Sequence, residues 1–60
     1  MKHSLETIGE WLDIIEEDGR DLTKWEEGFI ASVKDQMERG HGVSERQQEI
    51  VERIYAEKTP

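Results

Sequence analysis

Apolar residues recur along this chain at the three- and four-residue intervals of an α-helix, in three separate segments. In the first segment the apolar positions share one arc of roughly 120° on a helix: Leu5, Ile8, Trp11, Leu12 and Ile15. Similar faces follow in the other two segments, formed by Leu22, Trp25, Phe29, Ile30, Val33 and Met37 and then by Val43, Gln47, Ile50, Val51 and Ile54. The pattern predicts three amphipathic helices, each burying one face.

Two of the predicted helices begin with the same capping signal. Thr23 is followed three residues later by Glu26, and Ser44 is followed three residues later by Gln47. In such a capping box the hydroxyl accepts a first-turn backbone N–H, and the Glu or Gln side chain reaches back to the cap's own N–H. Both helix starts are therefore well defined by the sequence.

The remaining helix ends are marked by one serine and two glycines. Ser4 is placed to cap the first helix, while Gly19 and Gly40 follow the apolar segments in the position where helices commonly stop. We expect helices at about residues 5–18, 24–39 and 45–57. The short connection around Gly40 predicts that the second and third helices pack as an antiparallel hairpin. The fold class expected is all-α, a small three-helix bundle forming one domain over residues 1–60.

Sixty residues with 33% apolar content and no cysteine allow one small core without disulfides or a cysteine-based zinc site. In so small a core we expect Trp11 and Trp25 to be buried rather than to form a ligand platform. No apolar run is long enough for a membrane span or a signal peptide, so we expect a soluble protein with no membrane partner. Self-association could supply missing burial, but we favour a monomer over a homodimer because the first helix is strongly acidic.

The formal net charge of -7 is unevenly placed. Nine acidic residues lie between positions 6 and 27, where the only basic residues are Arg20 and Lys24. Later in the chain, opposite charges four residues apart balance one another, as in Lys34 with Glu38 and Asp35 with Arg39. Direct binding to nucleic acid is disfavoured, because phosphate contacts need a basic patch.

On the first helix, Glu6, Glu10, Asp13 and Glu17 fall within about 60° of one another and form what we call the acidic stripe. Like charges at these spacings cost a few tenths of a kcal/mol per pair, so stability alone does not explain the stripe. Its carboxylates would stand about 4.5 to 6 Å apart along the helix axis, which approaches the phosphate spacing of a nucleic-acid strand. The stripe is either a solvated face or a phosphate mimic. The candidate partner-binding residues are Glu6, Glu10, Asp13, Ile14, Glu17, Asp18 and Asp21.

Catalytic and metal chemistry find little support in the sequence. His3 and His41 are the only imidazoles, and neither has a second ligand at helical spacing. Carboxylates are abundant, but a three-helix domain of this size has little room for a pocket that excludes water. We expect no enzymatic activity, no cofactor and no bound metal.

The pattern L-x-x-W-E-x-x-F-I-x-S, followed by Q-x-x-x-G and S-x-x-Q-x-x-I-x-x-R-I-Y, resembles a helical cassette of small bacteriophage proteins. The cassette that it resembles also occurs as an appendage of phage DNA-metabolism enzymes. One protein that carries it is the small helical partner of a phage repair helicase. The resemblance covers a little over half of the chain and leaves out the acidic first helix. Its positions here are Leu22, Trp25, Glu26, Phe29, Ile30, Ser32, Gln36, Gly40, Ser44, Gln47, Ile50, Arg53, Ile54 and Tyr55. Small size and acidity also make the chain similar to some anti-CRISPR proteins in general character.

Together, the charge and the resemblance indicate a phage-type protein that acts in the cytoplasm of a bacterial host. The first hypothesis is that it binds, and inhibits, a protein with a basic nucleic-acid-binding surface. The alternative is an accessory or recruiting subunit of a phage DNA-metabolism enzyme such as a repair helicase. A third possibility is a homo-oligomer with no such target.

Overall fold

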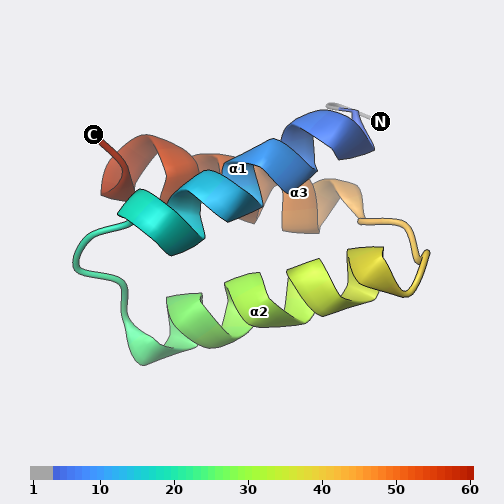
Figure 1. The fold of residues 1–60 in the computed structure, drawn as a ribbon, viewed down its shortest axis with the longest axis horizontal. Coiled ribbons are helices and arrows are strands. Elements are labelled where there is room, and N and C mark those ends of the chain that lie inside the picture. The colour runs from blue at the N-terminus through green and yellow to red at the C-terminus, as the bar shows by residue number, and fades with distance from the viewer. Residues whose placement is uncertain (1–3) are drawn as a thin grey trace.

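Three helices account for most of the chain in the computed structural model, which describes residues 4–60 (Figure 1). They are α1 (Leu5–Asp18), α2 (Lys24–Glu38) and α3 (Glu45–Lys58). The described residues contain no strand. The predicted all-α fold is confirmed, with α1 at its expected bounds, α2 one residue shorter and α3 one residue longer.

Both predicted capping boxes are present and fix the starts of α2 and α3. The Thr23 hydroxyl accepts from the Glu26 backbone N–H at 3.0 Å, and the Glu26 carboxylate accepts from the Thr23 N–H at 2.9 Å. The same reciprocal pair joins Ser44 to Gln47 at 3.1 and 3.0 Å. These bonds satisfy backbone donors that a helix start otherwise leaves without partners.

Glycine ends the second helix as the sequence predicted. Gly40 has a φ of 82°, in the left-handed region that residues with a side chain rarely adopt. Its N–H donates to the Met37 carbonyl at 3.0 Å, and the His41 N–H donates to the Gln36 carbonyl at the same distance. This closure turns the chain back toward α3.

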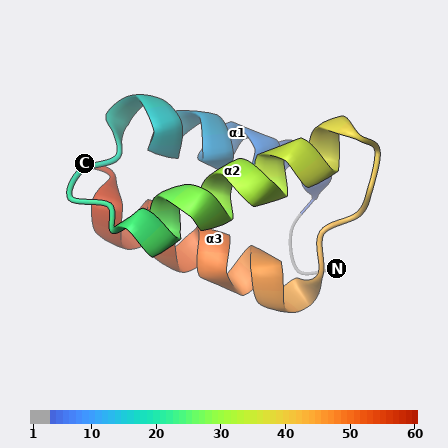
Figure 2. The same ribbon diagram turned by 90° about the horizontal axis from the view of Figure 1, so that it is seen from below.

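The helices form a bundle in which α1 and α3 run in the same direction and α2 runs opposite to both (Figures 1 and 2). The antiparallel arrangement expected for α2 and α3 is therefore present. The most extensive packing, however, joins α1 to α3, the first helix to the last. At their ends, the Arg20 N–H donates to the Lys58 carbonyl at 2.8 Å, which ties the α1–α2 connection to the last turn of α3.

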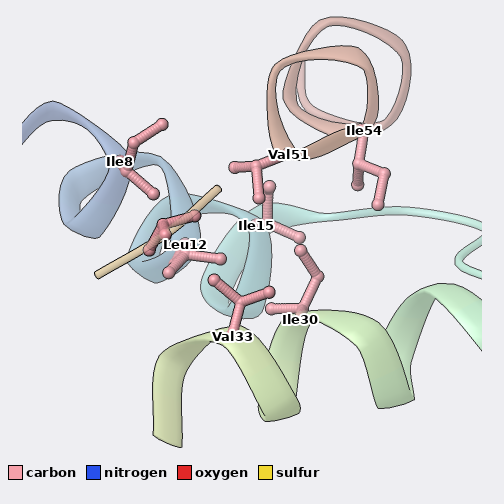
Figure 3. Packing of buried hydrophobic residues seen from close by; sticks show 8 residues of the cluster. Ile8, Leu12, Ile15, Ile30, Val33, Val51 and Ile54 are labelled. Atoms are coloured by element: carbon pink, nitrogen blue, oxygen red, sulfur yellow. The ribbon is translucent and has the colours of Figure 1, made fainter. Parts of the chain in front are cut away.

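The core lies where the three apolar faces meet, and its side chains point toward one another from all three helices (Figure 3). Every fully buried apolar residue of the described chain belongs to a face that the sequence predicted: Ile8, Leu12, Ile15, Ile30, Val33, Val43, Val51 and Ile54. Trp11 packs against this cluster and stacks on Tyr55, with ring centroids 5.1 Å apart. The expectation that Trp25 is also buried is wrong, because 63% of its surface is exposed.

One polar side chain is buried that the apolar pattern did not include. Gln48 is fully buried, and its Nε2 donates to the Val43 carbonyl at 3.1 Å. This bond matters because an amide buried without a partner would destabilise so small a core. Among residues 4–60, no helix is both long and apolar enough to cross a membrane.

Candidate partner-binding surface

The acidic stripe lies on the solvent side of α1. Ile8, Leu12 and Ile15, at spacings of four and three residues, turn the opposite side of this helix into the core. As a result the four stripe residues Glu6, Glu10, Asp13 and Glu17 are all exposed. The sequence prediction that these carboxylates share one accessible side of a helix is consistent with this geometry.

Lys34 of α2 reaches across to the stripe, a contact that the sequence did not indicate. Its ammonium lies 3.1 Å from an Asp13 carboxylate oxygen and also pairs with Glu16. Hydrogen bonds to Glu16 and then to Asp13 raise the pKa of Lys34 above its ordinary value. The pairing of Lys34 with Glu38 expected from their four-residue spacing does not form, whereas Asp35 and Arg39 do pair at 3.0 Å.

The ion pair divides the stripe into compensated and uncompensated charges. Asp13 has a counter-ion, but Glu6, Glu10 and Glu17 have no basic group of another described residue within 4 Å. At 1.5 Å per residue, Glu6 and Glu10 are about 6 Å apart along the axis, and Glu17 follows about 10.5 Å later. These three carboxylates therefore project from one side of a helix that the core holds in place.

A shallow hollow lies beside the stripe, between α1 and α2. It measures about 220 Å³ and is lined by Gly9, Leu12, Asp13, Lys34, Met37 and Glu38. Its floor is apolar and its rim is charged. A partner that contacts the stripe can therefore also place a small apolar side chain next to it.

The other candidate residues lie at increasing distance from the stripe. Ile14 is half-buried at the edge of the stripe, about 40° beyond Glu10 on the helix, and Asp18 is exposed about 40° farther round. Asp21 belongs to the α1–α2 connection, where its φ is 56° and its carbonyl accepts from the Lys58 ammonium at 3.3 Å. Asp21 is thus separate from the stripe.

A second surface feature was missed in the sequence. The exposed Trp25 stacks on Phe29, with ring centroids 5.2 Å apart and an interplanar angle of 13°. A signal was available, since Trp25 lies five residues from the buried Ile30 and hence about 140° away on the helix. That angle places Trp25 at the margin of the apolar face rather than at its centre.

Residues 4–60 hold no group of three or more histidine, aspartate or glutamate side chains arranged to bind a metal ion. His41 is exposed in the connection between α2 and α3, and His3 lies outside the described residues. The groups that the described surface offers to a partner are carboxylates, cationic side chains and aromatic rings.

Comparisons of this chain with protein-family models, with curated proteins and with solved structures found no match. The resemblance to the phage cassette stays a prediction that rests on the residues quoted for it.

Proposed function

We propose that this chain is a non-enzymatic, protein-binding domain that uses the acidic stripe to occupy the nucleic-acid-binding surface of its target. The observation that carries the proposal is the set of uncompensated carboxylates of Glu6, Glu10 and Glu17 on one exposed side of α1. Binding there would exclude nucleic acid and so inhibit the target. The proposed setting is the cytoplasm of a bacterium infected by a phage, as for anti-CRISPR proteins.

Electrostatics support a protein target rather than a nucleic-acid one. A chain with net charge -7 repels phosphate, but it is attracted to a groove lined with lysine and arginine. The carboxylates are held on a helix that the core fixes in place, so little ordering is needed when the partner binds. Lys34 joins α2 to α1 at Asp13, so the carboxylates left for the target are those of Glu6, Glu10 and Glu17.

Matched charge variants test this proposal. Glu6→Gln, Glu10→Gln and Glu17→Gln together remove three negative charges from the stripe. Glu45→Gln, Glu49→Gln and Glu57→Gln together remove the same number from exposed positions on α3. Each tagged protein is used to capture its target from lysate of a bacterial host, followed by mass spectrometry and by competition with duplex DNA.

We expect the wild type and the α3 variant to retain a nucleic-acid-binding protein that duplex DNA displaces. The stripe variant should lose it, because fewer opposite charges slow association and weaken the complex. If the α3 variant is the one that loses the target, or if DNA and this chain bind the target together, the stripe is not a phosphate mimic.

The second outcome would favour the alternative, an accessory or recruiting subunit of a phage DNA-metabolism enzyme. One observation supports that alternative: Trp25 and Phe29 are among the residues that carry the resemblance to the phage cassette, and their stacked pair includes the exposed Trp25. A recruiting subunit binds alongside DNA, whereas a mimic and DNA exclude each other.

A further inference from the structure

The side of the bundle formed by α2 and α3 and turned away from α1 carries a distinct combination of side chains. Its register is set at both ends. Gln36 and Gln47 donate to each other's side-chain oxygens at 3.1 and 3.2 Å, and Glu26 lies 3.9 Å from Lys58. These contacts align the start of α2 with the end of α3, and the end of α2 with the start of α3.

Helical spacing then places the intervening residues. Phe29 is seven residues before Gln36 and shares its side of α2, with Trp25 one turn earlier. On α3, Ile50 is three residues after Gln47, and Arg46 and Arg53 flank it at spacings of four and three. We call this set, Trp25, Phe29, Arg46, Ile50 and Arg53, the arginine–aromatic face.

Apolar surface is exposed on this face without being part of the core. Trp25 is 63% exposed, whereas Phe29 and Ile50 pack against the core and are only partly exposed. Arg46, Glu49, Ile50 and Arg53 line a hollow of about 120 Å³. Tryptophan and arginine are among the residues most often found at the energetic centre of protein interfaces.

The two arginines supply the charge that identifies a partner. No carboxylate of a described residue lies within 4 Å of Arg46 or Arg53, although the chain has fifteen acidic residues. Seven residues separate them, so they stand about 10.5 Å apart along α3, on either side of Ile50. An apolar residue with a carboxylate on each side would match this arrangement.

We propose that the arginine–aromatic face binds an amphipathic helix of a partner protein, one whose apolar residues are flanked by glutamate or aspartate. Trp25, Phe29 and Ile50 would take the apolar side chains, and Arg46 and Arg53 would pair with the carboxylates, as in helix-in-groove recognition. The face is separate from the acidic stripe, so this binding does not depend on the function proposed above.

Two other occupants fit less well. A nucleic acid carries a phosphate at every nucleotide, so it would place negative charge against Glu49 in the same hollow, whereas a helix can place carboxylates beside the two arginines alone. A second copy of the chain would bring together two molecules that each carry a net charge of -7.

Two designed helical peptides test the proposal by NMR titration of the full chain labelled with ¹⁵N. Both are 18-residue peptides with capped ends and one leucine face, flanked by glutamates in one peptide and by lysines in the other. The glutamate peptide should shift the Trp25 indole N–H and the Ile50 amide signals, and bind at least about tenfold more tightly than the lysine peptide. Absence of binding, preference for the lysine peptide, or shifts confined to α1 would overturn the proposal.

Variants of the protein distinguish this specific binding from nonspecific hydrophobic association. Trp25→Ala should weaken the glutamate peptide at least about tenfold without lowering the melting temperature by more than a few degrees, since the side chain is mostly exposed. Arg46→Glu with Arg53→Glu should reverse the preference in favour of the lysine peptide. The control Arg39→Glu reverses one charge at a position that Asp35 already compensates, and it should leave the preference unchanged.

Two further titrations examine the other occupants directly. An oligothymidine that shifts the same signals with higher affinity than the glutamate peptide would make the face a nucleic-acid site and overturn the proposal. Shifts of the same signals on raising the protein concentration alone would make a second copy the occupant, with the same consequence. Neither titration should move the Trp25 indole signal.

Discussion

The neighbouring residues Ile14 and Ile15 offer a direct measurement of how much the core contributes to stability. Ile15 is fully buried among the three helices, whereas Ile14, one position earlier on α1, is half-buried at the edge of the acidic stripe. Substituting each by valine removes one methyl group from the same helix and changes helix propensity equally. Burial is therefore the main difference between the two variants.

The expected loss in the free energy of unfolding differs between the two variants because the two side chains differ in burial. Ile15→Val should lower the free energy of unfolding by about 1 kcal/mol, since it leaves a small cavity in a close-packed site. Ile14→Val should cost less than about half of that, because water already reaches part of the side chain. A domain of 60 residues has a total stability of about 3–9 kcal/mol at 0.05–0.15 kcal/mol per residue. Ile15→Ala, at about 2–5 kcal/mol, should therefore remove a large share of the total stability.

Thermal and urea unfolding followed by circular dichroism at 222 nm provide the assay. One kcal/mol corresponds to a melting-temperature shift of about 4–8 °C in a domain of this size. Ile15→Val should thus melt several degrees below the wild type, and Ile14→Val should stay close to it. Equal shifts for the two variants, or a larger shift for Ile14→Val, would show that the packing described for α1 is incorrect.

Three other predictions concern single residues. The pKa of Lys34 is raised in the folded state, so its ion pairs contribute stability that is fully present below about pH 10.5, the pKa of the unfolded chain. This stability is lost as the pH rises towards the pKa of the folded protein. Thermal melts between pH 9 and 12 should therefore show the melting temperature of the wild type falling towards that of Lys34→Met. Gly28→Ala should stabilise by about 1 kcal/mol in urea unfolding, because nothing lies within 4 Å of the added Cβ in mid-helix. Gly40→Ala should destabilise by about 1–2 kcal/mol in the same assay, because its φ is 82°.

Local signals predicted the helices well. Each start depends on a cap within three residues, as Thr23 with Glu26 shows, and each core face depends on a spacing within one helix. Such features depend on residues that are only a few positions apart in the sequence, so periodicity and capping signals are enough to predict them. The same reasoning placed the carboxylates of the acidic stripe on one side of α1.

Features that depend on how helices face one another were not predictable in this way. Lys34 pairs with Asp13 and Glu16 because α2 packs beside α1, which no spacing along α2 specifies. Gln48 can be buried in an otherwise apolar site because its side-chain amide donates a hydrogen bond to the Val43 carbonyl. Trp25 was placed in the core because it shares the broad apolar face of its helix and because so small a core needs large side chains, although its angle on the helix left it at the margin.

The extensive packing of α1 on α3 has a consequence for how the chain folds. The hydrogen bond from Arg20 to Lys58 spans 58 − 20 = 38 residues, and the largest helix–helix contact joins segments separated by the whole of α2. Closing a loop of that length costs entropy before the contact is formed, and α2 with α3 alone lacks the buried residues of α1. During synthesis α1 therefore emerges first but stays without its main partner until residues 45–58 have been added, so that the three helices gain their stability in one cooperative step.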